Sequence, residues 1–375
     1  MNVDEKTGLA LVKDGEKFFF CSEHCRKQFA GEHHLDLDAC CAPPFYQNKI
    51  FALVAVLAVV IALSYFVPLL QPFRETLFMY IEKAWWATLL GLVLGGIMDH
   101  FVPQQYISQF LAASDKRTIV RAVLFGFLMS ICNHGILALS MQLYKKGAST
   151  SSVVAFLLAS PWANFPLTLL LISFFGLAKA LYIVLGAIVI AITTGLMFQI
   201  LEKKGWIETN QKTAALKKDF SVIEDLQKRF RAYSFSGAQL KQDMKGIAGG
   251  IVGLSDMVLW WIILGMSLAS LAGAYIPPHI FEHYMGPTFT GMLVTLLVAT
   301  VIEVCSEGTS PLAFEIYRQT GALGNSFVFL MAGVVTDYTE IGLIWQNIGR
   351  KAAMWLPILT VPQVIVWGII ANIIF

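Results

Sequence analysis

The sequence predicts an all-α polytopic membrane protein with two inverted repeats that contain broken or re-entrant helices. Hydrophobic residues make up 57% of the 375 residues and charged residues 14%, whereas soluble domains carry roughly 25% charged residues. A soluble fold could not bury this much apolar surface. The composition therefore excludes a soluble enzyme, a disordered chain, a disulfide scaffold and a nucleic-acid binder as descriptions of the whole chain. A series of long apolar stretches and an internal repeat support the same prediction.

Residues 1–49 are polar and predict a small cytoplasmic head. The head holds four of the six cysteines and three of the seven histidines. The aromatic run Phe18-Phe19-Phe20 indicates the end of a strand. Reduced cysteines on the cytoplasmic side favour metal binding over disulfides, so we expect a transition-metal ion (Zn or Cu) here; incidental surface cysteines are the alternative. The candidate ligands are Cys21, His24, Cys25, His33, His34, Cys40 and Cys41.

Seven apolar stretches are long enough, at about 1.5 Å per residue, to cross a hydrocarbon core about 30 Å thick. Two more, 118–144 and 288–319, are each interrupted by a polar tetrad that contains glycine. The predicted crossings are 50–71, 84–103, 151–175, 177–200, 252–275, 322–346 and 353–374. They divide the chain into a first transmembrane helix with its connector (50–83), a first repeat (84–201), a basic linker (202–250) and a second repeat (251–375).

Matching residues in the two halves lie 173 to 175 positions apart and keep their order. Duplicated halves with glycine-interrupted apolar segments at matching positions are typical of secondary transporters, and the interruptions indicate the binding site. The matched segments are Trp85-Trp86 with Trp260-Trp261, Cys132-Asn133-His134-Gly135 with Cys305-Ser306-Glu307-Gly308, and Asn164 with Asp337.

The distribution of lysine and arginine predicts the orientation in the membrane. The linker carries ten of these residues between 202 and 245, so we expect it in the cytoplasm. If the two interrupted stretches crossed the membrane, the head would lie outside. If they are re-entrant hairpins, head and linker share the cytoplasmic side and each repeat crosses three times. We favour the second topology, with seven crossings, two re-entrant hairpins, a cytoplasmic N-terminus and a bacterial inner membrane.

The two tetrads are the strongest candidate for an ion site, because ionisable groups inside apolar stretches are costly unless they are paired or hydrated. Two thiolates, an imidazole and a carboxylate suit a soft or borderline ion such as Zn(II) or Cu(I). The alternative is that the cysteines pack as small residues and the polar side chains satisfy a broken backbone. The candidate substrate-binding residues are Cys132, Asn133, His134, Cys305, Ser306 and Glu307.

Asn164 and Asp337 form a second matched pair of candidate substrate-binding residues. The segment Ser160-Pro161-Trp162-Ala163-Asn164 must break or kink its helix, because proline lacks an N–H group. Glu340 lies one helical turn after Asp337, and Glu303 precedes the second tetrad. We regard Glu303, Asp337 and Glu340 as candidates for proton coupling. The alternative for the matched pair is capping of a broken helix.

At these residues the sequence resembles a known family. Residues 84–374 resemble the predicted permease family that includes organoarsenical efflux permeases, and especially its Cu/Zn efflux branch. The resemblance rests on the first tetrad, on Ala159 to Asn164 and on Glu303 to Pro311. Many relatives carry Cys-Ser-Cys-Gly at the first tetrad, whereas Asn133 and His134 stand here. The resemblance implies export, and this departure favours a metal ion as the cargo.

The head resembles a truncated YHS/TRASH-type metal-binding domain from Gly15 to Phe29. Such domains usually begin with Cys-x-Met. Met1 stands where that methionine would be, and the preceding cysteine is missing. We therefore expect the natural start of translation to lie upstream of Met1.

These observations favour a secondary-transport permease, and not an enzyme, that exports Cu or Zn ions with proton coupling. No P-loop motif is present, which excludes a P-loop ATPase. The first alternative is a permease for trivalent organoarsenicals or another thiol-reactive metalloid. Others are a membrane-embedded thiol or metal-dependent enzyme and a metal sensor. The expected partners are the lipid bilayer, the metal or metalloid substrate and a second copy of the chain, but no nucleic acid. We expect no catalytic cofactor.

Overall fold

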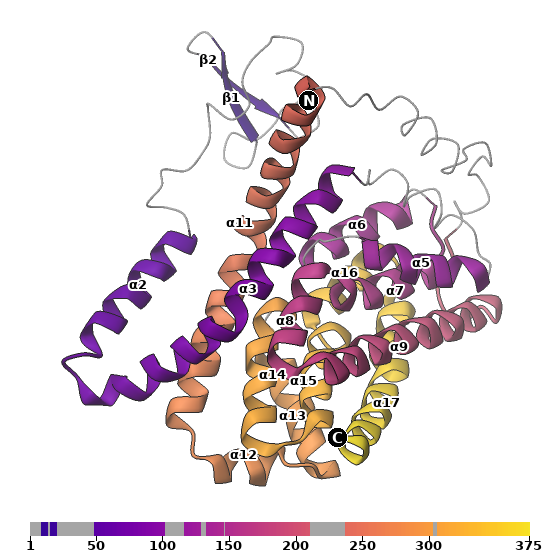
Figure 1. Cartoon of the computed structure of the whole chain (residues 1–375). Helices are drawn as coiled ribbons and strands as arrows, with labels where there is room; N and C mark the ends of the chain where they lie inside the picture. The colour runs from indigo at the N-terminus through magenta and orange to yellow at the C-terminus, as the bar shows by residue number, and fades with distance from the viewer. Residues whose placement is uncertain are drawn as a thin grey trace. The chain divides into compact units, whose positions relative to one another are not determined.

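The computed structural model describes residues 9–13, 16–20, 49–101, 116–128, 133–145, 147–210, 237–302 and 306–375. The chain forms two compact units, residues 1–59 and 60–375. The second unit is built from helices (Figure 1). This architecture confirms the predicted all-α polytopic membrane fold.

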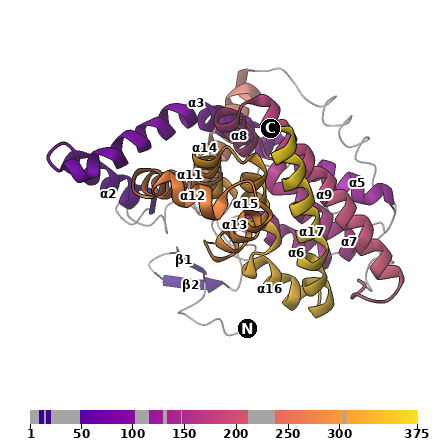
Figure 2. The same ribbon diagram turned by 90° about the horizontal axis from the view of Figure 1, so that it is seen from below.

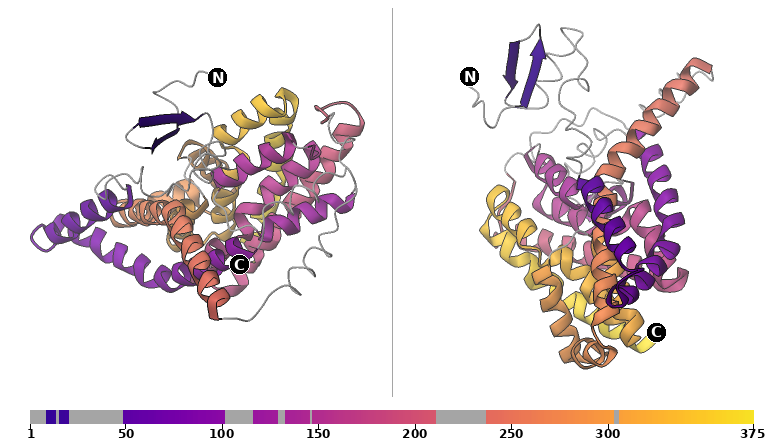
Figure 3. Two further views of the ribbon diagram at one scale, coloured as in Figure 1. Left: turned by 90° about the horizontal axis from the view of Figure 1, so that it is seen from above. Right: turned by 90° about the vertical axis from the view of Figure 1, so that its left-hand side faces the viewer.

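The first unit contains an antiparallel hairpin of β1 (Leu9–Lys13) and β2 (Glu16–Phe20), in which Leu9 pairs with Phe20 (Figure 3). The predicted strand that ends in the aromatic run at Phe20 is confirmed. All seven candidate metal ligands of the head lie outside the described residues, so metal binding by the head stays a prediction.

Five helical segments among the described residues are long and apolar enough to cross a membrane, or up to seven if each of two bent pairs counts as one span. In one pair, α7 (Thr150–Ala159) and the 3-10 turn η3 (Ser160–Ala163) meet α8 (Phe165–Phe175) at 49°. In the other, α12 (Pro278–Met285) meets α13 (Phe289–Ile302) at 103°. The other helices are α2 (Lys49–Leu63), η2 (Pro68–Leu70), α3 (Gln71–Phe101), α5 (Lys116–Leu128), α6 (Asn133–Lys145), α9 (Leu177–Lys203), α11 (Gly237–Tyr275), α14 (Ser306–Thr320), α15 (Leu323–Val335), α16 (Tyr338–Asn347) and α17 (Arg350–Ile374).

The predicted first crossing, 50–71, is wrong as a single helix. Helix α2 ends at Leu63, and Val67 adopts an extended conformation (φ −113°, ψ 106°) before Pro68. A residue that precedes proline is sterically pushed out of the helical region, which explains the break. Helix α3 then begins at Gln71 rather than near 84, so most of the predicted connector is helical. Helix α11 likewise begins at Gly237 and includes the end of the predicted linker.

The helices of the two halves follow the same order. Helices α3, α5, α6, α7, α8 and α9 correspond to α11, α13, α14, α15, α16 and α17. The positions of the first half that match α12 lie outside the described residues. Helix α6 begins at Asn133 and α14 at Ser306, 173 residues later. Gly176 and Gly349, both with positive φ, precede α9 and α17 at the same spacing. Helix α5 ends before the first tetrad and α6 begins within it, and α13 ends before the second tetrad and α14 begins within it. Whether these segments re-enter or cross the membrane stays a prediction.

Corresponding helices of the two halves pack in antiparallel pairs. Helices α3 and α11 lie side by side (Figure 1), and the end of α3 meets the start of α11 where His100 Nε2 lies 3.1 Å from Asp243 Oδ1. Helices α9 and α17 also pack together (Figure 2). There the Tyr182 hydroxyl near the start of α9 donates to the carbonyl of Trp367 near the end of α17, at 2.8 Å.

The loop after α9 holds the start of α17. The Glu208 carboxylate accepts hydrogen bonds from the backbone N–H groups of Lys351 (3.1 Å) and Ala352 (3.0 Å). Burial opposes the charge on Glu208, but these two N–H groups outweigh it and lower the pKa of the carboxyl below its usual value. The carbonyl of Glu208 accepts from Thr150 Oγ1 at 2.8 Å. One loop residue therefore joins the first turns of α7 and α17.

We predict that Glu208→Gln destabilises the protein at neutral pH by roughly 1 kcal/mol, the usual effect of losing a helix cap. Because the pKa of Glu208 is lowered in the folded state, its stabilisation is complete above the pKa of the unfolded chain and is lost as the pH falls through the folded value. Thermal unfolding of purified protein in detergent, followed as a function of pH, measures this. The exposed Glu282→Gln variant is the control. Equal melting temperatures of Glu208→Gln and the parent at pH 7 would contradict the prediction.

Candidate functional site

Two of the predicted site residues, one from each half, meet at the break between α7 and α8. Asn164 Nδ2 donates a hydrogen bond to Glu307 Oε1 at 3.2 Å. Asn164 is 2% exposed and Glu307 1% exposed. This contact joins residues 143 positions apart, one from each half. The sequence predicted both residues as site candidates, and the structure places them in direct contact.

Local sequence explains the break. Pro161 stands in η3 and Pro166 in the first turn of α8. Proline cannot donate to the helical ladder but is tolerated in a first turn. Asn164 is extended (φ −80°, ψ 146°), and its Oδ1 accepts from the N–H of Leu167 at 2.7 Å. The amide oxygen of Asn164 thus caps α8, and its amide nitrogen donates a hydrogen bond to Glu307.

Asp337 has the same position in the second half. It is the N-cap of α16, and its Oδ1 accepts from the N–H groups of Thr339 (2.6 Å) and Glu340 (3.1 Å). Asp337 is 7% and Glu340 2% exposed. The predicted capping of a broken helix is confirmed for both members of the matched pair.

Glu307 lies in the first turn of α14. Its Oε2 accepts from Ser306 Oγ at 3.2 Å, so both side chains that donate to Glu307 among the described residues, Ser306 and Asn164, are neutral. A helix N-terminus favours a carboxylate, but a charge this deeply buried is costly without a cationic partner. Within the described residues, neither of the ion pairs includes Glu307. Glu307 is therefore a buried acidic residue of the second tetrad whose hydrogen-bond donors Asn164 and Ser306 are neutral.

Glycines let neighbouring helices approach these breaks closely. A Cβ on Gly265 of α11 would lie 2.1 Å from the carbonyl oxygen of Gly308 in the second tetrad. A Cβ on Gly91 of α3 would lie 2.4 Å from Cα of Pro166. The helix that faces Gly91 is therefore α8. Long helices of both halves thus rest directly on the segments that carry the site.

Each helix that begins in a tetrad packs against a broken helix of the other half. Helix α14, which begins in the second tetrad, packs against α8 of the first half. Helix α6, which begins in the first tetrad, packs against α16 of the second half. Each tetrad helix thus meets the broken helix that begins after Asn164 or Asp337 in the opposite half.

Several predicted site residues lie outside the described residues, namely Cys132, Cys305 and Glu303. Asn133 and His134 begin α6, but only their backbone is described. Among the described side chains no group of three or more His, Cys, Asp or Glu residues could hold a metal ion. The joint ligand set of Cys132, His134 and Cys305 with Glu307 therefore stays a prediction.

One polar atom beside the break has no partner. Trp162 is fully buried, and its indole N–H makes no hydrogen bond. It lies two residues before Asn164. Buried polar groups are usually hydrogen-bonded, so this donor is available to a bound ligand or to water. Sequence reasoning did not single out Trp162 because a tryptophan in an apolar stretch is usually a packing residue.

A second buried polar cluster was missed by the sequence analysis. Glu315 accepts from Arg318 Nε (2.9 Å) and from an Arg318 terminal amino group (2.6 Å), from Gln319 Nε2 (2.6 Å) and from the hydroxyl of Tyr80. Tyr80 is fully buried and Glu315 is 1% exposed. The spacing of Glu315 and Arg318 inside an apolar stretch was a usable signal, but Tyr80 is 235 residues away. The hydrogen bonds to Glu315 come from Tyr80 on α3 and from Arg318 and Gln319 on α14, which favours a structural role that ties α3 to α14.

The sequence signature of the predicted permease family ArsP_1 matches residues 71–373. The chain belongs to this permease family. The family resemblance seen in the tetrads and the proline-containing break is confirmed, and it indicates a membrane-embedded transporter rather than an enzyme.

Related proteins agree with this assignment. A Streptococcus mutans protein, whose name describes it as a subunit of a two-component membrane permease complex, is 23% identical over 68% of this chain and 79% of its own. The UPF0718 protein YcgR of Bacillus subtilis is 22% identical over 68% of this chain and 81% of its own. A UPF0718 protein of Methanocaldococcus jannaschii is 21% identical over 77% of this chain and 91% of its own. No solved structure matches the chain significantly.

The contact between Gly265 and the second tetrad yields a prediction. Gly265→Ala would place a methyl group against the Gly308 carbonyl and force α11 away from α14, at a cost of roughly 1–3 kcal/mol. We expect a lower melting temperature in detergent and less monodisperse protein. Gly253→Ala on the same helix is the matched control, because a Cβ there meets nothing within 4 Å. If the two variants melted at the same temperature, the close approach of α11 and α14 would be wrong.

Proposed function

We propose that the chain is a secondary-transport permease that exports soft or borderline metal ions of the Cu/Zn class in exchange for protons. The observation that carries the proposal is the buried contact between Asn164 and Glu307, which joins the break of the first half to the second tetrad. Broken helices that meet inside a membrane protein line the substrate path in secondary transporters.

In this proposal the cargo is bound by Cys132, His134, Cys305 and Glu307. Thiolate and imidazole ligands select Cu(I) and Zn(II) over hard cations. Helices α6 and α14 begin within the two tetrads, so His134 and Glu307 belong to the first turns of these helices. Asn133, Ser306, Asn164 and Asp337 lie beside these ligands in the sequence or at the matching breaks, where they orient ligands and hold the backbone. The free indole N–H of Trp162 offers a further donor to the hydrated cargo.

The surroundings of Glu307 support the proposal of proton coupling. Glu307 is 1% exposed, and the side chains that donate to it among the described residues are neutral. Such a group is stabilised by a bound metal cation or by a proton, but not by both together. Competition between the two would make metal release depend on proton uptake. Glu303, Asp337 and Glu340 are the residues proposed to pass protons to and from it.

Alternating access is supported by the relation between the halves. Two pairs of corresponding helices, α3 with α11 and α9 with α17, run antiparallel. Inverted-topology repeats require this orientation, and transport proceeds by moving one repeat against the other around a central site. We propose that the head delivers or senses the metal in the cytoplasm of a bacterial cell and that the permease works as a homo-oligomer.

The alternative cargo is a trivalent organoarsenical or another thiol-reactive metalloid. It is favoured by the two cysteines, one in each tetrad, because trivalent arsenic forms bonds to thiolates. Such a cargo would need Cys132 and Cys305 but would not need the Glu307 carboxylate. The two cargo classes therefore differ in their dependence on Glu307.

Transport by the full chain in proteoliposomes tests this difference. We expect Glu307→Gln to lower Zn(II) or Cu(I) flux at least tenfold, and Cys132→Ala with Cys305→Ala to abolish it. The exposed Glu282→Gln variant should transport normally. Arsenical flux that is lost with the cysteines but unchanged in Glu307→Gln would replace the metal proposal with the alternative. Full metal flux in the double cysteine variant would refute it.

Asn164→Asp provides a test of proton coupling. Aspartate retains the oxygen that caps α8, as Asp337 does in the other half, so we expect the variant to fold. It places a second carboxylate about 3.2 Å from Glu307, and two adjacent carboxylates retain a shared proton to higher pH. The pH at which metal flux begins to rise should therefore be higher in the variant than in the parent. An unchanged pH profile in a folded, active variant would contradict the role of Glu307 in coupling.

A further inference from the structure

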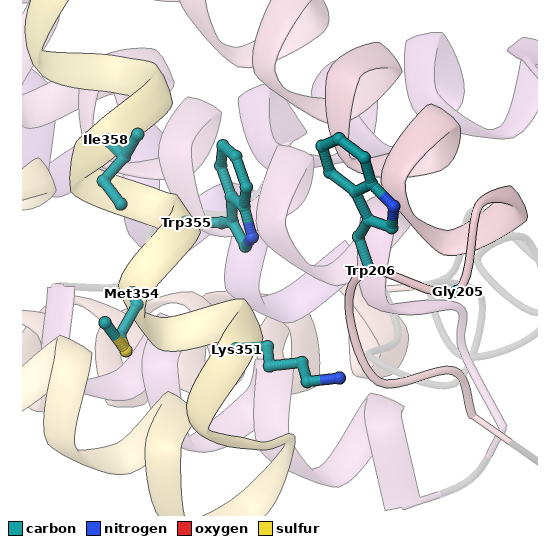
Figure 4. Close-up of a pocket in the computed structure, with 6 residues that line it drawn as sticks. All are labelled: Gly205, Trp206, Lys351, Met354, Trp355 and Ile358. Carbon is teal, nitrogen blue, oxygen red and sulfur yellow. The ribbon is translucent and has the colours of Figure 1, made fainter.

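A surface groove lies where α9 ends and α17 begins. Its volume is about 490 Å³, and it is lined by Gly205, Trp206, Lys351, Met354, Trp355 and Ile358. Figure 4 shows the rings of Trp206 and Trp355 side by side, with the Lys351 side chain extended below them towards the loop. The two ring centroids are 6.1 Å apart, and the ring planes make an angle of 27°.

The groove lies at the ends of two candidate membrane spans. Helix α9 (Leu177–Lys203) ends just before Gly205, and α17 (Arg350–Ile374) begins beside Lys351. Tryptophan and lysine gather at the boundary between hydrocarbon and water in membrane proteins. The groove therefore runs from the membrane boundary into the apolar part of α17.

Its two ends differ in chemistry. Met354 and Ile358, one helical turn apart on α17, are 56% and 53% exposed. At the other end, Lys351 is exposed and the Lys204 ammonium lies 5.4 Å from the ring centre of Trp206. Apolar side chains thus lead directly to a pair of cations beside two indole rings.

Acidic neighbours offset only part of the positive charge at this end of the groove, because the Glu208 carboxylate attracts Lys351 but does not reach Lys204 or Arg350 with a hydrogen bond. Glu208 directs both carboxylate oxygens to the backbone N–H groups of Lys351 and Ala352. Glu202 Oε1 accepts from the backbone N–H of Thr150 at 3.0 Å, and its side chain is largely buried. The Arg350 guanidinium, 5.4 Å from the ring centre of Trp345, adds a further positive charge nearby.

We propose that this groove is a binding site for an anionic phospholipid. The lipid phosphate lies between Lys204 and Lys351, its glycerol backbone lies against Trp206 and Trp355, and one acyl chain follows Met354 and Ile358. Charge complementarity selects this occupant, because basic pockets at the membrane boundary bind anionic headgroups. A soluble phosphate compound would leave the apolar end unused, and a second copy of the chain would bring a like charge to Lys204 and Lys351.

Native mass spectrometry of the full chain in detergent, titrated with phosphatidylglycerol or phosphatidylcholine, tests the site. We expect tighter binding of phosphatidylglycerol and about a tenfold loss of its affinity in the Lys204→Gln, Lys351→Gln double variant, because each basic side chain near an anionic headgroup contributes. Phosphatidylcholine binding should not change. The matched control is Lys83→Gln with Lys179→Gln, which removes two lysines that also lie over aromatic rings, Phe314 and Tyr317.

Three outcomes would overturn the proposal. The first is equal binding of the two lipids by the parent protein, and the second is an equal loss of phosphatidylglycerol in the control variant. The third is a change from oligomer to monomer in the double variant without loss of lipid, which would identify the groove as a contact between copies. Because the substituted side chains are exposed, the melting temperature of the double variant in lipid-free detergent should equal that of the parent. The test does not depend on the transported cargo.

Discussion

Backbone N–H groups at a helix start inside an apolar medium have no water to bind, so the protein itself must supply their acceptors. Helices α8 and α16 both begin at such positions. Asn164 and Asp337 supply the acceptors with one side-chain oxygen each. This constraint allows breaks to exist at matching places in the two halves. The Asn164 amide then has its nitrogen left to bind Glu307.

The position of Glu307 depends on helices that approach closely. Gly265 lets α11 rest on the second tetrad, and Gly91 lets α3 rest on the start of α8. In a membrane, helices associate through close packing of small residues, because lipid provides no hydrophobic driving force between them. A buried carboxylate near the centre of such packing has few ways to be solvated. This burial is the reason why we propose Glu307 as the residue that couples the cargo to protons.

The buried cluster around Glu315 shows the opposite use of a charge. Glu315 is paired by Arg318 with two hydrogen bonds and receives further ones from Gln319 and Tyr80. A charge satisfied in this way fixes helices rather than binding cargo. Glu307 and Glu315 lie on the same helix, two turns apart. Both are buried glutamates, so residue type and burial do not distinguish them. Their partners do, and on this basis we assign transport to Glu307 and a structural role to Glu315.

Much of this organisation could be predicted from the sequence. The spacing of 173 residues located both tetrads and both N-caps, and Pro161 predicted the break that is seen. The predicted end of the first transmembrane helix was wrong, because two local effects compete there. Apolar composition extended the first helix to 71, but Pro68 ends it early through its effect on Val67.

The membrane class, the broken segments and the family could be determined from the sequence by itself. They depend on the composition of single stretches and on the likeness between two stretches, and both can be read along the chain. Contacts between residues more than a hundred positions apart depend on how whole helices pack. Only the tertiary structure therefore decided that Asn164 binds Glu307, that Tyr80 binds Glu315, and that Trp206 and Trp355 line one groove.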